Sequence, residues 1–107
     1  MNFILHYSPQ SLNDLDEIHE YIQTELSNPS AAIRIVNDIM DAVEKLQDYP
    51  NMGTRLSSVS NIQSDYRFLI SNNYMVFYRH LGNDVYIDRV LYARRNYLRI
   101  LFEEHLI

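Results

Sequence analysis

The residues best suited to chemistry are arginines in the second half of the chain, with tyrosines interleaved among them. They are Arg67, Arg79, Arg89, Tyr92, Arg94, Arg95, Tyr97 and Arg99. Guanidinium groups bind phosphates and tyrosine rings stack on bases, so this set suits contact with RNA. It also suits metal-free phosphodiester cleavage, in which arginines stabilise charge on the phosphate while a tyrosine or histidine moves the proton. Alternatively, Arg94, Arg95 and Arg99 pair with Glu103, Glu104 or the acidic helices and have only a structural role.

The composition argues against several other kinds of site. The chain has no cysteine, which excludes disulfides, thiolate metal ligands and cysteine nucleophiles. Two glycines in 107 residues leave no glycine-rich phosphate loop, and the four histidines are scattered. No serine-nucleophile motif is present, so we expect neither a metal nor a cofactor. Four acids are interpreted as the solvated face of a helix, namely Asp14, Asp16, Glu17 and Glu20.

Charge is divided unevenly along the chain, although the formal net charge is −5. Residues 1–54 carry nine acids and two bases, a balance of −7, whereas residues 55–102 carry seven arginines and three acids, a balance of +4. We therefore expect a polyanionic or acidic partner to dock on the second half. No apolar run is long enough to span a membrane and no signal-peptide pattern opens the sequence, so we expect a cytoplasmic location.

The first half predicts two amphipathic helices. Ser8-Pro9 is a helix-start signal, and apolar residues recur at spacings of three and four over residues 9–26. Asn28-Pro29 repeats that signal, and a second apolar stripe runs over residues 29–49 until Pro50 ends it. The short turn between the stripes makes the two helices antiparallel, with both apolar faces toward one core.

The remaining apolar runs predict strands at residues 2–7, 66–70, 74–79 and 85–92. Asparagine and glycine turn signals join the last three strands into an antiparallel meander, which follows a polar loop over residues 51–64. The helix pair must bury its apolar stripe on one face of that sheet. The expected fold is α+β, ordered β-α-α-β-β-β with room for a short C-terminal helix, as a single domain over residues 1–107.

Alternation within the strands separates two faces of the sheet, and the first hairpin loop sets their register. We favour a three-residue loop at Ser71–Asn73, which leaves Arg67 and Arg79 on the open face, over a two-residue loop, which puts Arg67 opposite Tyr78. The favoured register also exposes three apolar residues, Leu69, Met75 and Phe77. Such a patch indicates a binding site, unless residues 96–107 fold back and cover it. The last strand needs a bulge to turn all of its apolar residues inward, namely Ile87, Val90 and Leu91.

An ordered set of motifs spans nearly the whole chain. It comprises Ser8-Pro9 with Leu12, Asp14, Leu15, Ile18, Tyr21 and Ile22, then Asn28-Pro29 with Ala31-Ala32, Leu46 with Pro50 and Gly53, Tyr66-Arg67, Asn73-Tyr74 with Val76-Phe77-Tyr78-Arg79, and Arg89-Val90-Leu91-Tyr92-Ala93-Arg94-Arg95. This set resembles the RelE/ParE superfamily of bacterial toxins from type II toxin–antitoxin pairs.

The resemblance implies a small growth-inhibiting toxin that a cognate antitoxin keeps silent. ParE-like members poison DNA gyrase and are not known for catalysis, whereas RelE-like members cut messenger RNA on the ribosome without a metal. ParE-like action is slightly favoured, because Leu69 and Met75 stand where RelE has basic residues and the net charge of −5 disfavours steering toward RNA. A third alternative is a degenerate member that only binds its antitoxin.

Each alternative implies its own site residues. A nuclease would use a catalytic set of Arg67, Tyr92, Arg94, Arg95 and Tyr97. A binding inhibitor would use contact residues Arg79, Arg89, Arg99, Leu69, Met75 and Phe77. In either case we expect the antitoxin to cover the apolar members of the second set.

Overall fold

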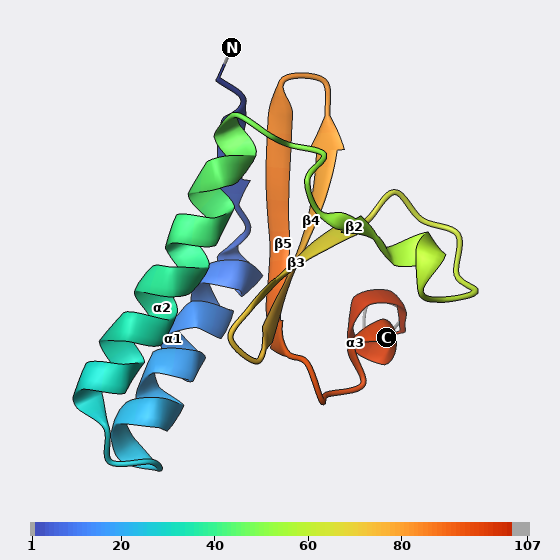
Figure 1. The fold of residues 1–107 in the computed structure, drawn as a ribbon. Helices are drawn as coiled ribbons and strands as arrows, with labels where there is room; N and C mark the ends of the chain where they lie inside the picture. Colours follow the sequence, from blue (N-terminus) through green and yellow to red (C-terminus); the bar gives the residue numbers. More distant parts are fainter. Residues whose placement is uncertain (1, 104–107) are drawn as a thin grey trace.

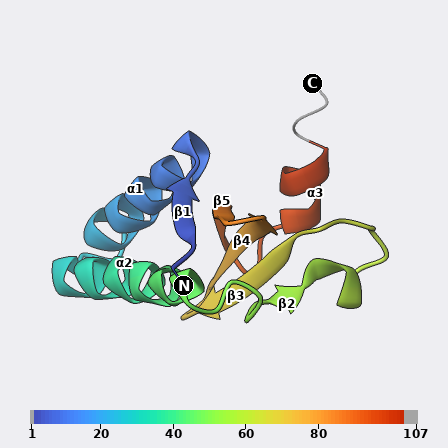
Figure 2. The same ribbon diagram turned by 90° about the horizontal axis from the view of Figure 1, so that it is seen from above.

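A computed structural model describes residues 2–103 and has three layers (Figure 1). Two helices form one layer, a five-stranded sheet forms the second, and a short helix lies on the opposite face of the sheet (Figure 2). The elements are β1 (Ile4–Tyr7), α1 (Pro9–Thr24), α2 (Pro29–Glu44), the 3₁₀ turn η1 (Lys45–Gln47), β2 (Thr54–Arg55), the 3₁₀ turn η2 (Leu56–Ser58), β3 (Arg67–Ser71), β4 (Tyr74–Leu81), β5 (Asp84–Tyr92) and α3 (Tyr97–Phe102). The expected α+β fold is thereby confirmed.

Both helices begin where the sequence signals predict. The Ser8 hydroxyl accepts a hydrogen bond from the Ser11 N–H, and the Asn28 side chain accepts one from the Ala31 N–H. In each case the cap satisfies an N–H group that has no partner within the helix, and the proline that follows needs none. The two helices lie side by side as the expected antiparallel hairpin (Figure 1).

The sheet has the strand order β1-β5-β4-β3-β2. β1 runs parallel to β5, and the other neighbours are antiparallel. The meander of β3, β4 and β5 is as expected. β2 was not expected, because the sequence predicts a polar loop over residues 51–64. In the structure, Thr54 and Arg55 of this segment pair with Phe68 and Arg67 of β3.

The favoured register of the first hairpin is wrong. The turn between β3 and β4 has two residues, Asn72 and Asn73, and Ser71 pairs directly with Tyr74. Asn72 takes a φ of +55°, a left-handed conformation that asparagine tolerates better than most residues. Arg67 therefore stands opposite Tyr78, on the sheet face that meets the helices, and not on the open face.

A bulge in β5 divides its apolar residues between the two faces of the sheet. The pairing with β4 shifts at Phe77 and Tyr78, so that Asp88 is the additional residue. Ile87 and Val90 pack toward the helices, whereas Leu91 packs on the opposite side.

The core has two parts, one on each face of the sheet. On the helix side it comprises Leu15, Ile18, Ile22, Ala31, Ala32, Ile39, Val43, Leu46, Leu69, Val76, Tyr78, Val85, Ile87 and Val90. On the α3 side it comprises Leu56, Phe68, Met75, Phe77, Leu91, Ile100 and Leu101. The expected exposure of Leu69, Met75 and Phe77 is wrong, because all three are buried. The fold-back alternative is correct for Met75 and Phe77 as far as residue 103, whereas the helices cover Leu69, and residues 104–107 lie outside the described part.

Candidate functional site

A buried ion pair fixes α1 against β5. Asp14 accepts hydrogen bonds from the Arg89 guanidinium at 2.8 and 2.9 Å and from the Val90 N–H at 2.9 Å. The interpretation of Asp14 as a solvated residue is wrong, since its exposure is 6%. Three partners satisfy the carboxylate, which offsets the loss of its water. Arg89, expected to contact a partner protein, thus also holds the two layers together.

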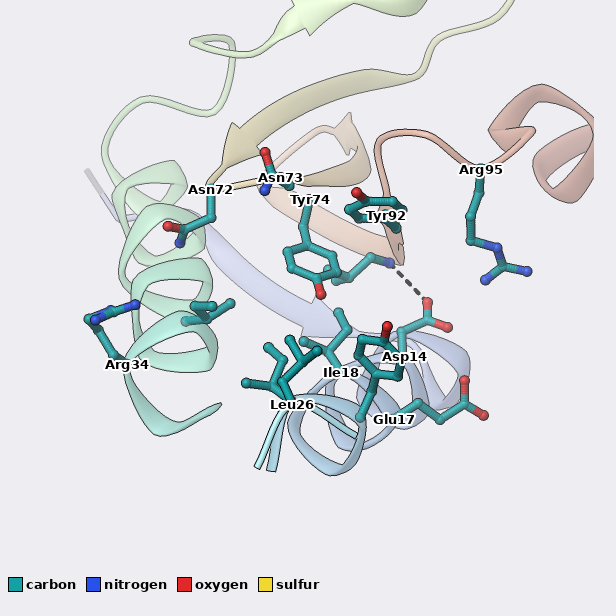
Figure 3. Close-up of a pocket in the computed structure, with 14 residues that line it drawn as sticks. Asp14, Glu17, Ile18, Leu26, Arg34, Asn72, Asn73, Tyr74, Tyr92 and Arg95 are labelled. Carbon is teal, nitrogen blue, oxygen red and sulfur yellow. Dashed lines mark hydrogen bonds between the residues drawn. The ribbon is translucent and has the colours of Figure 1, made fainter. Parts of the chain in front are cut away.

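A groove of about 710 Å³ lies between the helical hairpin and one end of the sheet (Figure 3). It is lined by Asp14, Glu17, Ile18, Tyr21, Ile22, Leu26, Arg34, Ile35, Asn72, Asn73, Tyr74, Val90, Tyr92 and Arg95. The strand ends meet the helices here because the β3–β4 turn and the last residues of β5 lie at the same end of the sheet. We call this hollow the tyrosine groove.

Apolar and aromatic side chains make up most of the tyrosine groove. The rings of Tyr74 and Tyr92 lie 5.7 Å apart, and Tyr92 itself is partly exposed. Tyr21 and Leu26 are 54% and 57% exposed, so their apolar surface is open to a partner. Burial raises the pKa of Tyr74 above its usual value.

Two arginines stand at opposite ends of the tyrosine groove. Arg34 extends from α2 on one side, and Arg95 follows β5 on the other (Figure 3). Among residues 2–103, neither guanidinium has a carboxylate partner. The groove therefore combines an apolar floor with a positive charge at each end, which suits a peptide with apolar side chains flanked by acids.

Arg67, the first residue of the expected nuclease set, is engaged by the loop after α2. Its Nη1 donates to the carbonyl oxygens of Gly53 at 2.9 Å and Asn51 at 3.2 Å. Tyr78 supports the same loop, because its buried hydroxyl donates to the Pro50 carbonyl and accepts from the Gly53 N–H. Arg67 thus has a structural role in holding this loop.

The remaining members of the nuclease set do not join Arg67. Tyr92 pairs with Tyr74 and hence lies level with Ser71, four residues along β3 from Arg67. At about 3.3 Å per residue, this is a separation of roughly 13 Å along the strand. Arg94 and Arg95 follow Tyr92 and so continue away from the sheet. Tyr97 packs on the opposite face, with its ring 5.3 Å from that of Phe77.

Arg79 lies, as expected, on the sheet face opposite the helical hairpin, in a hydrogen-bonded cluster with Tyr66 and Asp88. The Tyr66 hydroxyl and the Arg79 Nε both donate to the same Asp88 oxygen, at 2.8 and 3.1 Å. Burial and then the hydrogen bond to Asp88 raise the pKa of Tyr66. Burial lowers the pKa of Arg79, but the combined effects of Asp88, Tyr66 and Asp65 outweigh burial and the net shift is upward. The carboxylate neutralises Arg79, which weakens it as a phosphate ligand.

The other sequence-based alternatives can be compared with the same structure. Arg99 is 3.7 Å from Glu103, one helical turn on, which agrees with the structural role considered for it. Within residues 2–103, no three His, Asp or Glu side chains are grouped closely enough to hold a metal ion. In the same part of the chain, no helix has both the length and the hydropathy needed to cross a membrane.

Sequence reasoning missed several residues of these sites. Asp14 could have been found, because with Ser11, Leu15 and Ile18 it falls on the buried side of the three-and-four spacing. The groove residues Tyr21 and Arg34 gave no local signal, since they belong to helices whose pairing with the strand ends is set only by the tertiary fold.

Comparison with known proteins identifies the family. The model of the family described as ParE toxin of type II toxin-antitoxin system, parDE, matches residues 5–97. The chain is 31% identical over 99 residues to "Putative toxin Y4kP" of Sinorhizobium fredii, covering 91% of this chain and 95% of that protein. It also matches a solved structure titled chromosomal ParDE TA system from P. aeruginosa, with 26% identity, a TM-score of 0.69, and coverage of 82% and 92% of the two chains. The chain therefore belongs to the ParE family of toxins from type II toxin–antitoxin systems, within the expected RelE/ParE superfamily.

Proposed function

We propose that this ParE-type toxin inhibits growth by binding DNA gyrase, in the cytoplasm, and does not cut messenger RNA. The observation that supports this proposal is that the expected nuclease set does not converge, because Tyr92 lies level with Ser71, four residues along β3 from Arg67, and Arg94 and Arg95 follow Tyr92. A nuclease needs several charged groups converging on one phosphate. Here Arg67 and Arg95 lie toward opposite ends of the sheet, and Asp88 neutralises Arg79.

The experiment compares the two targets directly. The chain is induced without an antitoxin, messages are mapped by primer extension, and purified chain is added to gyrase in a supercoiling assay. We expect intact messages, reduced supercoiling, and linear DNA when gyrase is digested after the reaction. Codon-phased cuts that vanish when translation is blocked, without any effect on gyrase, would establish the nuclease instead.

A double variant serves as the matched control. Arg67→Gln with Arg94→Gln removes two members of the nuclease set, and thermal unfolding shows whether the variant is folded. Under the gyrase proposal, a folded double variant still inhibits supercoiling. Loss of growth inhibition in a folded variant would favour the nuclease.

We further propose that the cognate antitoxin docks in the tyrosine groove. The sheet face first expected to receive it is unsuited, because Met75 and Phe77 are already covered by α3. The groove offers exposed apolar surface at Tyr21 and Leu26 together with positive charge at each end. An antitoxin segment with apolar side chains and flanking acids fits this arrangement.

A further inference from the structure

A second hollow lies away from the tyrosine groove, beside β2. It has a volume of about 370 Å³ and is lined by Asn51, Arg55, Ser57, Gln63, Ser64, Asp65, Tyr66, Arg67 and His80. The lining comes from the loop after α2, from β2 and η2, from the residues before β3, and from β4. We call it the β2 pocket. Its lining is almost entirely polar, which suits a small charged ligand better than an apolar peptide.

The charges of the β2 pocket are unbalanced. Arg55 and Arg67 both line it, and among residues 2–103 neither has a carboxylate partner. Asp65 is the one acid in the lining. By contrast, Arg79, Arg89 and Arg99 each lie within 4 Å of a carboxylate. Two arginines facing one polar hollow, in a chain of net charge −5, indicate an anion site.

Arg67 and His80 of the β2 pocket are already held in position. The carbonyls of Asn51 and Gly53 fix one nitrogen of Arg67, and the other nitrogens of its guanidinium make no hydrogen bond within the described chain. Both ring nitrogens of His80 are hydrogen-bonded, one to the Asn51 side chain at 2.9 Å and the other to the Gly82 carbonyl at 2.8 Å, so this ring is a fixed part of the pocket wall and not a donor to a ligand. A ligand that binds prepositioned groups loses less conformational entropy on binding.

Serine hydroxyls complete the set of donors. The Ser64 Oγ accepts a hydrogen bond from the Tyr66 N–H at 3.3 Å, which leaves its own hydrogen available to a ligand oxygen. Ser57 adds a second hydroxyl from η2. Guanidinium and hydroxyl donors that surround a hollow match the several oxygens of a phosphate better than the two coplanar oxygens of a carboxylate.

We propose that the β2 pocket binds a phosphate group, presented by a nucleotide or by a nucleic-acid backbone, with Arg55 and Arg67 as its charged ligands. This site shares no residue with the tyrosine groove or with the contact set expected for a binding inhibitor. It therefore goes beyond the proposed function and can fail or hold independently of it. The volume admits a phosphate together with its attached sugar.

The test is a titration of the purified full-length chain followed by the NMR signals of its backbone amides. Inorganic phosphate is added first, then adenosine monophosphate, a short single-stranded RNA and a short duplex DNA. Acetate at equal ionic strength reports any preference for a carboxylate. We expect phosphate to shift the amides of Arg55, Ser57 and Ser64, and acetate to leave them in place. The titrations with adenosine monophosphate, RNA and DNA identify which source of phosphate binds more tightly.

Two variants with the same change of charge locate the site. Arg55→Gln alters an exposed side chain and should weaken phosphate binding by about tenfold, the scale of a lost charge-assisted contact. Arg34→Gln removes an arginine from the tyrosine groove and should leave phosphate binding unchanged. Equal losses in the two variants, equal shifts with acetate, or no shift at millimolar phosphate would each overturn the proposal.

Discussion

Asp14 shows how much of this fold depends on one buried charge. Its carboxylate accepts three hydrogen bonds that join α1 to β5, and replacing it leaves the Arg89 guanidinium without that carboxylate in a site where its side chain is 17% exposed. We expect Asp14→Ala to lower the free energy of unfolding by about 3–5 kcal/mol, the usual cost of breaking a buried pair from one side. Urea unfolding of the purified chain measures this loss.

Two further variants separate the effect of the ion pair on stability from the effect of changing α1 itself. Asp16→Ala lies two residues away on the exposed face of α1 and should change stability by less than about 0.5 kcal/mol. The double variant Asp14→Leu, Arg89→Met removes both charges. Its loss of unfolding free energy should therefore be smaller than the sum of the losses in the single variants Asp14→Leu and Arg89→Met. Strictly additive losses would show that the pair itself contributes nothing.

Single residues also show which features could be predicted from the sequence and which could not. The cap residues Ser8 and Asn28 could be predicted, because a cap acts on N–H groups two or three positions along the chain. Gly53 could not, since the reason for it is distant in sequence. A Cβ at this position would lie 2.5 Å from the Tyr78 hydroxyl, and only the folded loop brings these two residues together.

At the scale of elements, the strands were predictable but their faces were not. The choice between a two-residue and a three-residue turn at Asn72 and Asn73 inverts every side chain of β3 relative to β4. The two-residue turn places Leu69 and Arg67 on the face toward the helices, where Leu69 is buried, and places Phe68 under α3. The open face for which the sequence predicted a partner is thus covered by the chain's own α3, in agreement with the fold-back of residues 96–107 that was considered as the alternative.

The tyrosine groove is a property of elements, because α1, α2 and the ends of β3 and β5 build it together. If the antitoxin docks there, Tyr21→Ala and Tyr92→Ala should each weaken antitoxin binding by about thirtyfold, the effect of losing an aromatic anchor. Both side chains are more than one third exposed, so the fold should survive either change. Isothermal titration calorimetry with the purified antitoxin measures the two losses.

Tyr49 provides the control for this prediction. It is 67% exposed in the segment after η1 and does not line the groove, so Tyr49→Ala should bind the antitoxin as the parent chain does. Unchanged affinity in the Tyr21 and Tyr92 variants would move the antitoxin to another surface. That result would leave the gyrase proposal standing, because that proposal rests on the separation of the expected nuclease set and not on the groove.

At the scale of the whole molecule, the acidic and basic halves of the sequence become neighbouring layers. The helical hairpin carries most of the acids, whereas the sheet and the segment that follows it carry all the arginines except Arg34, and the pair of Asp14 with Arg89 joins the two layers. Among residues 2–103, the arginines without a carboxylate partner are Arg34, Arg55, Arg67, Arg94 and Arg95. The net charge of −5 therefore conceals a local excess of positive charge at the β2 pocket, and an arginine at each end of the tyrosine groove.

The stability of the whole molecule should fall at alkaline pH, because several of its tyrosines are buried. Burial raises the pKa of Tyr78, with partial opposition from the Gly53 N–H, and burial together with Asp88 raises the pKa of Tyr66. Above pH of about 10 the unfolded chain loses tyrosine protons that the folded chain keeps, so the folded state binds more protons and the free energy of unfolding decreases. The contribution is complete below this pH and is lost as the pH rises through the folded pKa values.

Urea unfolding at a series of pH values between about 9 and about 11 measures the slope of this decrease. Tyr66→Phe removes one buried titrating hydroxyl and should make the slope shallower, although it also removes the hydrogen bond to Asp88 and so lowers stability at pH 7. Tyr49→Phe removes a hydroxyl from an exposed ring and should leave the slope unchanged. A slope that is equally steep in the parent chain and in Tyr66→Phe would assign the alkaline loss to other groups, and the cluster of Tyr66, Arg79 and Asp88 would then contribute to stability without pH dependence in this range.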